Sequence, residues 1–259
     1  AAAPRITFNL RRSVLGARRT LGRSEPPVKR RARRPAANCE VFVMLRMDKK
    51  PWSSVGLGRE NARPGTLARG FLIGLCAIGI PSVLLIAGSQ LQIMPAREGS
   101  SLSAAGFAFV MLLPAAFYEE LAMRGYPFMA IREAFGWKAA LIVTSTVFGL
   151  MHMANPNVDA ESVLLVILAG FFLGAILSAT GSLFAAGMAH FGWNWAMAAL
   201  MHTNVSGIAV PSPDFRTVDN GPDWLTGGAW GPEGGLAAGA GMVVAFIYLY
   251  ARRIRRLES

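Results

Sequence analysis

Charged residues, cysteine and histidine are all scarce in this chain. Asp, Glu, Lys and Arg make up 16% of its 259 residues, against 53% hydrophobic residues, and it has two cysteines and three histidines. Cys39 lies in a polar tail and Cys76 in an apolar stretch, and no Cys-x-x-Cys pair occurs, which argues against a disulfide framework and a cysteine zinc knuckle. The apolar residues fall in long uninterrupted runs, which a soluble domain of this size does not need and which are typical of a membrane protein.

Basic charge is concentrated at one end of the chain. Residues 1–69 hold 17 of the 26 Lys and Arg residues and 4 of the 15 Asp and Glu residues, so their net charge is +13. The other 190 residues hold 9 basic and 11 acidic residues, a net charge of −2. Basicity is therefore a property of the tail, and no nucleic-acid partner is expected for the main body.

The tail is predicted to be a disordered basic extension covering residues 1–68. Residues 1–43 are rich in Arg, Pro, Ala and Ser and have no sustained apolar period. Three interpretations stay open: a transit peptide, a cytoplasmic extension, or a stretch outside the natural product that starts at Met44 or Met47. A cleaved secretory signal is not expected, because no short apolar core with a small-residue cleavage site precedes residue 69.

From residue 69 onward the pattern predicts an all-α polytopic membrane domain, residues 69–259. A bilayer core about 30 Å thick needs about 20 helical residues. Six apolar spans approach or meet this length: roughly 69–92, 101–131, 137–155, 161–180, 182–202 and 235–251. The second of them contains charged residues, which have to be buried in a helical bundle or open to a wet cavity.

The connections between spans differ in charge on the two sides of the membrane. The tail, the connection with Arg132 and Lys138, and the C-terminal "ARRIRRLES" are basic and fall on one side if there are six spans. The opposite connections, 156–161 and 203–234, are poor in Lys and Arg. Both termini are therefore expected to be cytoplasmic.

The long connection 203–234 is rich in Gly and Pro and contains Trp224 and Trp230. These tryptophans suggest a surface at the membrane interface. A loosely structured outer loop is predicted here, with a lid over the site as the alternative.

The first candidate motif is Glu119-Glu120-x-x-x-Arg124 in the second span. On a helix Glu120 and Arg124 share a face and form a favourable pair. Glu119 lies about 100° further round the helix and has no such partner. A carboxylate left without a cation inside the membrane is a candidate general base, and the alternative is that both glutamates end the helix at a wet interface.

Two further motifs place histidines in later spans. Phe148-x-x-x-His152 lies in the third span, and His190-x-x-x-Asn194 puts two polar groups on one face of the fifth. His190 and Asn194 suit the stabilisation of a negative oxygen, although a hydrogen-bonded pair that only packs two helices is the alternative. His202, at a span end, is interpreted as interfacial.

Several other hydrolytic and nucleotide-binding sites are excluded by the sequence. It contains no Gly-x-Ser-x-Gly elbow, no His-Glu-x-x-His zinc motif and no P-loop. No aspartate lies within a predicted span, which argues against an aspartyl dyad.

In this order on separate helices, the three motifs resemble the CPBP family of intramembrane proteases, which includes type II CAAX prenyl endopeptidases and relatives linked to bacteriocin self-immunity. The family pattern is Glu-Glu-x-x-x-Arg, Phe-x-x-x-His and His-x-x-x-Asn or Asp. It is filled here by "EELAMR" at 119–124, "FGLMH" at 148–152 and "HFGWN" at 190–194. The likeness covers roughly residues 100–205.

The resemblance implies a role for each motif residue. Glu119 and His152 would activate the attacking water, and His190 and Asn194 would stabilise the tetrahedral oxyanion. The remaining motif residues would support the site: Glu120, Arg124 and Phe148. Zinc and metal-independent mechanisms both stay open for this family, and the second is favoured because two histidines and a glutamate bound to zinc would no longer serve as base and oxyanion donors.

These observations predict an endopeptidase that cleaves a membrane-associated protein or peptide, in a bacterial inner membrane. A prenylated substrate is not predicted, because the Ala-, Arg- and Gly-rich composition is typical of a bacterium with a GC-rich genome. Two other functions stay open: a non-catalytic immunity or scaffold protein, and an ion or proton transporter. One geometric difficulty remains, since straight helices place Glu119 and His152 about 20 Å from the cytoplasmic span ends but His190 only about 10 Å.

Overall fold

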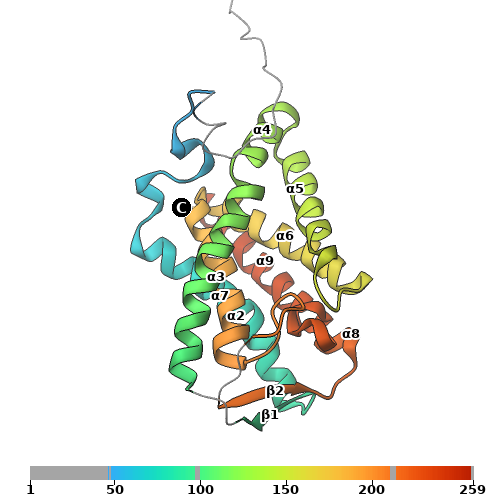
Figure 1. The fold of residues 1–259 in the computed structure, drawn as a ribbon. Coiled ribbons are helices and arrows are strands. Elements are labelled where there is room, and N and C mark those ends of the chain that lie inside the picture. The colour runs from blue at the N-terminus through green and yellow to red at the C-terminus, as the bar shows by residue number, and fades with distance from the viewer. Residues whose placement is uncertain (1–45, 47, 97–99, 211–213, 258–259) are drawn as a thin grey trace, which may run out of the picture. The chain divides into compact units, whose positions relative to one another are not determined.

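The computed structural model describes residues 46, 48–96, 100–210 and 214–257. The predictions for residues 1–43 and for Cys39 fall outside this part of the chain. The described part is mostly helical (Figure 1). Its helices are α2 (Pro64–Ala87), α3 (Ser101–Arg124), α4 (Tyr126–Phe135), α5 (Trp137–Met151), α6 (Ala160–Thr180), α7 (Leu183–Trp195), α8 (Asp223–Thr226) and α9 (Leu236–Leu257).

Among the described residues, four stretches are long and apolar enough to cross a membrane, and the chain is an integral membrane protein. They are Pro64–Ala87, Ser101–Phe135, Trp137–Ala154 and Ala160–Thr180. The other two predicted spans are shorter as regular α-helix. α7 has 13 residues and continues as one π-helical stretch, η4 (Ala196–Met201), while the apolar part of α9 is Leu236–Ala251. The count of six spans therefore stays a prediction.

The predicted second span, 101–131, is not one helix. α3 ends at Arg124, and Gly125, with φ −78° and ψ −122°, takes the backbone out of the helical region before α4 begins. Gly125 and Pro127, the second residue of α4, favour a break here, because glycine is a weak helix former and proline is tolerated in the first turn of a helix. The break makes Arg124 the last residue of α3.

α7 lies against α2 with the two backbones in direct contact. A Cβ added to Gly70 would lie 2.4 Å from the carbonyl oxygen of Ala185, and one added to Gly74 would lie 1.8 Å from that of Ala189. The pair α5 and α6 is similarly close, since a Cβ on Gly170 would lie 2.8 Å from the Cα of Ser145. Small residues thus allow close helix approach in both pairs.

Gly74→Ala is expected to lower the free energy of unfolding by about 1–3 kcal/mol, because the added methyl group overlaps the α7 backbone. Thermal unfolding in detergent measures this as a lower Tm. The matched control is Gly79→Ala in the same helix, where nothing lies within 4 Å of an added Cβ. Alanine favours a helix more than glycine does, so the control is expected to keep or raise Tm. Equal melting temperatures for the two variants would contradict the close approach.

The start of α7 lies beneath two short helices, η1 (Trp52–Val55) and η2 (Arg59–Asn61). The amide of Leu183 donates to the carbonyl of Gly56 at 3.0 Å, and the Ser182 hydroxyl donates to the carbonyl of Asn61 at 3.0 Å. Residues 48–63, predicted to belong to the disordered extension, are therefore structured here. Span five begins next to these two short helices, and His190 and His152 both lie within 4.0 Å of Glu119 Oε2. The three side chains therefore converge, although straight helices of equal start predict different depths.

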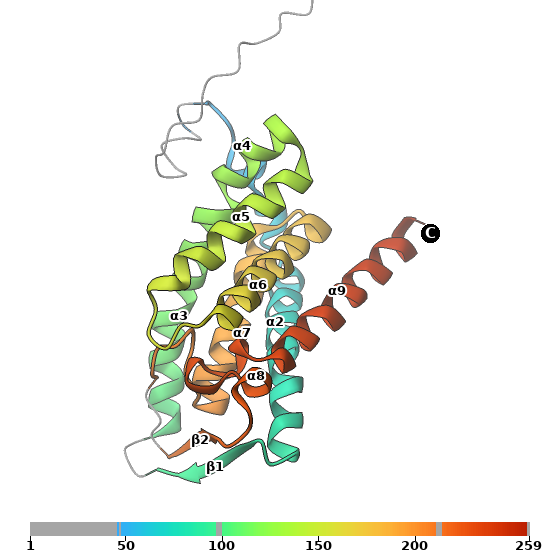
Figure 2. The same ribbon diagram turned by 90° about the vertical axis from the view of Figure 1, so that its right-hand side faces the viewer.

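The connection 203–234, which we call the outer segment, is folded rather than loosely structured. β1 (Leu91–Pro95), which the sequence analysis missed, pairs antiparallel with β2 (Phe215–Asp219) (Figure 2). Trp224 is exposed, but Trp230 is only 2% exposed, so the interfacial interpretation is wrong for Trp230.

His202, predicted to be interfacial, is buried instead. It ends η4 in the left-handed backbone conformation, with φ 51°, and this turn directs the chain back towards β2. Its ring packs edge-on against Phe215 with the centroids 4.3 Å apart. The span therefore ends inside the fold, beneath the outer segment.

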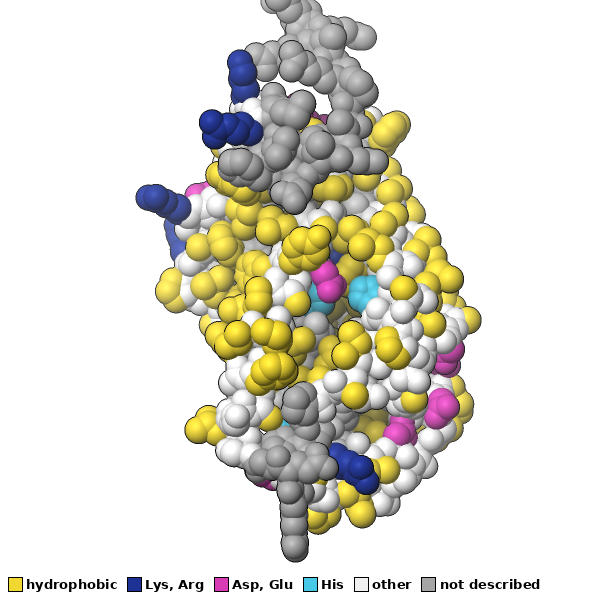
Figure 3. All heavy atoms as spheres, in the orientation of Figure 1, with side chains coloured by type: hydrophobic (Ala, Val, Ile, Leu, Met, Phe, Trp, Pro, Cys, Tyr) yellow, Lys and Arg dark blue, Asp and Glu magenta, His cyan; other side chains and the backbone are white. Residues whose placement is uncertain are grey.

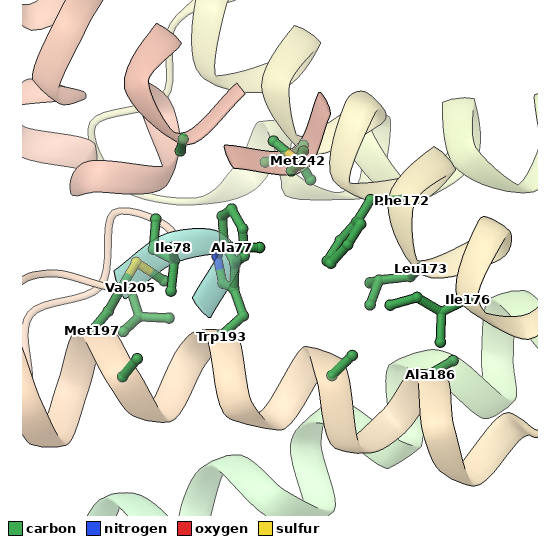
Figure 4. Packing of buried hydrophobic residues seen from close by; sticks show 14 of the residues in the cluster. Ala77, Ile78, Phe172, Leu173, Ile176, Ala186, Trp193, Met197, Val205 and Met242 are labelled. Carbon is green, nitrogen blue, oxygen red and sulfur yellow. The ribbon is translucent and has the colours of Figure 1, made fainter. Parts of the chain in front are cut away.

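The hydrophobic core lies where α2, α6, α7 and α9 meet (Figure 4). Ile78, Phe172, Trp193 and Met242 are almost completely buried there. The rings of Phe172 and Trp193 are 6.1 Å apart, which ties α6 to α7. This packing fixes the orientation of the helix that carries His190 and Asn194.

Candidate active site

The predicted pair of Glu120 and Arg124 forms at the end of α3 and is fully buried. The Arg124 Nη1 lies 3.1 Å from Glu120 Oε1, and both side chains are 0% exposed. Arg124 Nη2 also donates to the carbonyl of Gly170 on α6 at 2.9 Å. The helical spacing argument is confirmed for this pair, which joins α3 to α6.

Phe148 on α5 lies between the charged pair and the histidines. The Arg124 Cζ is 4.4 Å from the centroid of its ring, a cation–π distance. The ring centroid is 4.8 Å from that of His152 and 5.8 Å from that of His190. Phe148 therefore sets the spacing of three polar groups by contact.

His152 follows the last residue of α5 and begins a short 3₁₀ turn, η3 (His152–Ala154). Its Nδ1 is 2.8 Å from the carbonyl oxygen of Phe148, so Nδ1 carries a proton and donates it there. In the neutral ring the other nitrogen, Nε2, is then an acceptor. This Nε2 lies 4.0 Å from Glu119 Oε2.

His190 on α7 lies between two carboxylates. Its Nδ1 is 3.2 Å from Glu120 Oε1, and its Nε2 is 3.8 Å from Glu119 Oε2. The ring donates from Nδ1 to Glu120, while its Nε2 faces Glu119 across a distance too long for a hydrogen bond. Glu120 thus contacts Arg124 and His190 at once.

Glu119 is the acidic residue that both histidines face. Its side chain is 37% exposed, while its Oε2 atom is buried and has no hydrogen-bond partner among the described residues. Acidic and histidine side chains are exposed together in a hollow of a largely hydrophobic face (Figure 3). The structure therefore brings Glu119, His152 and His190 to one point that is open on one side.

Asn194 lies one helical turn after His190 and lines a small cavity of about 30 Å³ next to the histidines. His152, His190 and Phe148 line the same cavity. All seven candidate residues are therefore grouped around one site, with Asn194 at its inner wall.

Two further polar residues line this cavity that the sequence analysis did not select, Ser206 and Glu233. Glu233 is 8% exposed and accepts hydrogen bonds from Trp193 and Ser206. A signal was present in the sequence: Glu233 is a single charge between the Gly-rich stretch and the last apolar helix. It was attributed to an outer loop because Gly and Pro dominate its surroundings.

Among the described residues, no group of three or more His, Cys, Asp or Glu side chains is placed to hold a metal ion. The Nε2 atoms of the two histidines lie 4.0 and 3.8 Å from the same Glu119 oxygen. A zinc ion, whose ligand atoms lie at about 2.0–2.3 Å from the metal, would have to sit between these three atoms.

Comparison with known proteins finds one family. Residues 101–196, from the start of α3 to the first residue of η4, match the family model described as Rce1-like, type II CAAX prenyl endopeptidase. The matched region contains all three motifs. No curated protein and no solved structure matches the chain.

Proposed function

We propose that this integral membrane protein, whose residues 101–196 match the family model of Rce1-like type II CAAX prenyl endopeptidases, hydrolyses a peptide bond in a membrane-associated substrate. The observation that supports this most directly is the shared position of Glu119 Oε2, which lies 4.0 and 3.8 Å from the Nε2 atoms of His152 and His190. A water molecule next to that oxygen meets a base and two imidazoles together.

In the proposed reaction Glu119 is the general base. It takes a proton from water as the water oxygen bonds to the carbonyl carbon of the substrate. His152 orients the water through its unprotonated Nε2, since its Nδ1 proton is held by the Phe148 carbonyl. The exposed side of Glu119 is where the substrate approaches.

The attack leaves negative charge on the former carbonyl oxygen. Preorganised donors aimed at that oxygen lower the barrier more than donors in water do. The Nε2–H of His190 and the side-chain amide of Asn194 supply them in this proposal. The carbon–nitrogen bond then breaks, and Glu119 returns its proton to the leaving amine, so no covalent acyl-enzyme forms.

Glu120 and Arg124 support the site without touching the substrate in this proposal. Glu120 accepts from His190 Nδ1 and so holds the ring in the orientation that points Nε2 at Glu119. Arg124 balances the Glu120 charge and bonds to the carbonyl of Gly170. The oxyanion donor thus depends on a buried charged group behind it.

The protein is placed in this proposal in a bacterial inner membrane, with six spans and both termini cytoplasmic. One contact supports placing the segment before η1 and the connection after α3 on the same side of the membrane. The Lys50 Nζ lies 2.5 Å from Glu133 Oε1 in α4. Reporter fusions after residues 96 and 259 test the topology, with opposite compartments expected.

The experiment that tests the function is proteolysis in detergent with two anchored fluorogenic peptides. One carries a farnesylated Cys-a-a-X end, and the other carries a palmitoyl anchor instead. Membrane extract of the expression host, followed by N-terminal peptide mapping, extends the search. Cleavage by the wild-type chain that is lost in Glu119→Ala, His152→Ala and His190→Ala is expected. Unchanged cleavage in all three variants, or no wild-type cleavage of any of the three probes, would sink the proposal.

Metal removal is expected to leave turnover unchanged, because the proposed reaction uses no metal. Turnover of the cleaved peptide is measured before and after treatment with a chelator, and the metal content of the purified protein is measured by mass spectrometry. Loss of activity that added zinc restores would show a metalloprotease and overturn the metal-independent mechanism.

A further inference from the structure

Glu233 is a buried carboxylate whose hydrogen bonds come from two distant parts of the chain. Its Oε2 accepts from the indole Nε1 of Trp193 at 2.8 Å. Its Oε1 accepts from the backbone amide of Ser206 at 2.6 Å and from the Ser206 hydroxyl at 2.7 Å. All three donors are neutral, so the carboxylate is held by directed hydrogen bonds.

The hydrogen bond from Trp193 connects Glu233 to α7. Trp193 lies immediately before Asn194 and three residues after His190 in that helix. Because the indole is bonded at its far end to Glu233 and packs on Phe172, α7 is held against rotation about its axis. The directions of His190 and Asn194 depend on that rotation.

The hydrogen bonds from Ser206 connect Glu233 to the segment next to His152. The side-chain amide of Asn155 donates to the carbonyl oxygen of Ser206 at 3.0 Å. Asn155 follows η3, which His152 begins. The neighbouring Gly207 lies so close to this turn that an added Cβ would be 1.9 Å from the carbonyl oxygen of Pro156. Ser206 is thus in contact with the segment that ends α5.

These hydrogen bonds form a continuous path from Trp193 through Glu233 and Ser206 to Asn155. One end of this path fixes the helix of His190 and Asn194, and the other fixes the turn of His152. The same cavity is lined by His152, His190, Asn194, Ser206 and Glu233. Ser206 and Glu233 of the outer segment therefore form part of the wall next to the two histidines.

We propose that Glu233 is a positioning residue, which fixes the separation of His152 from His190 and Asn194 through its bonds to Ser206 and Trp193. This inference rests on the proposed peptidase function. Glu233 does not touch the substrate in it. A displacement of about 1 Å at a reacting group can cost roughly a hundred-fold in rate, which gives such a residue a large effect on turnover.

The test compares variants that each weaken or remove one of the hydrogen bonds made to Glu233. Glu233→Gln replaces one accepting oxygen by a donor and keeps the shape, while Trp193→Phe and Ser206→Ala each remove a single donor. We expect Glu233→Gln to lower kcat by about ten- to a hundred-fold with little change in KM, and the two others to lower it less. Asp223→Asn, an exposed carboxylate in the same segment, is the matched control and is expected to leave kcat unchanged.

A double-variant cycle separates positioning from a loss of folded protein. If Glu233 acts through Asn194, then Asn194→Ala reduces kcat less in the Glu233→Gln protein than in the wild type, because the two effects are coupled. Effects that multiply independently, or kcat within about two-fold of wild type for all three single variants, would overturn the proposal. If Glu233→Gln does not fold, Trp193→Phe and Ser206→Ala are each combined with Asn194→Ala in the same kind of double-variant cycle.

A second readout does not depend on peptidase activity. The chain has three histidines, so labelling of histidine side chains gives an NMR spectrum with three ring signals. We expect the signals of His152 and His190 to move in Glu233→Gln and to stay in place in Asp223→Asn. If both signals stay in place, Glu233 does not position these rings. If they move while the wild type cleaves nothing, the peptidase proposal fails and the positioning role stands.

Discussion

Replacing Glu119 with glutamine is expected to lower kcat by about a hundred- to ten-thousand-fold, the range found when a positioned acid–base group is removed. Glutamine keeps the size and the hydrogen-bonding oxygen but cannot take a proton from water. The neighbouring Glu120 is not expected to replace it, because its side chain is 0% exposed and its charge is paired with Arg124. Single-turnover cleavage of the anchored peptide measures the change in the chemical step.

The matched control for this variant is Glu60→Gln, an exposed glutamate in η2 that lies outside the site. Its kcat and KM are expected to equal those of the wild type. Because Glu119→Gln keeps the shape of the site, it is also expected to hold uncleaved substrate, which can be recovered and identified. A Glu119→Gln protein with wild-type kcat would contradict the assignment of Glu119 as the base.

Replacing Arg124 with methionine is expected to cost about 3–5 kcal/mol of unfolding free energy, because it leaves the Glu120 carboxylate buried without its cation. Both side chains are 0% exposed, so water does not reach the charge that remains. The bond from Arg124 to the Gly170 carbonyl is lost as well. For a chain of this size, thermal unfolding in detergent is expected to show a decrease in Tm of roughly 6–20 °C.

The double variant Glu120→Gln with Arg124→Met distinguishes two causes of the lower Tm. One is the unpaired charge of Glu120, and the other is the loss of the packing and hydrogen bonds of Arg124. With both charges of the pair removed, neither is left buried without its partner, and much of the decrease in Tm is expected to be recovered. Arg132→Met, an exposed arginine of α4, is the control and is expected to change Tm by little. A double variant that is less stable than Arg124→Met alone would show that the pair acts mainly through its shape and hydrogen bonds.

The parts of the site that depend on local helical geometry were predictable from the sequence. A spacing of four residues on one helix pairs Glu120 with Arg124, whatever surrounds the helix. Intramembrane ionisable residues are costly, so the glutamates and histidines were sound candidates before their positions were known. That His152 and His190 would face the same oxygen of Glu119 was not derivable, because their separation is set by how α5 and α7 each pack against α3 and α6.

The features that the sequence did not predict depend on contacts between remote segments. β1 forms only because β2 returns to it from more than 100 residues later. The break at Gly125 is different, because Gly125 and Pro127 are a local signal that the predicted span 101–131 did not use. Glu233 lies in a Gly- and Pro-rich stretch that is typical of a loop. Its burial becomes visible only when Trp193 and Ser206 are placed around it.

The close contacts between α2 and α7 and between α5 and α6 have a consequence for the spacing of His152 and His190. Each contact joins two backbones with no side chain between them. A side chain can change its rotamer, but two backbones in contact can separate only if a whole helix moves. His190 lies on a helix of the first pair, and His152 follows a helix of the second. In the proposed reaction the spacing of the two histidines is therefore expected to depend on how the two helix pairs pack together.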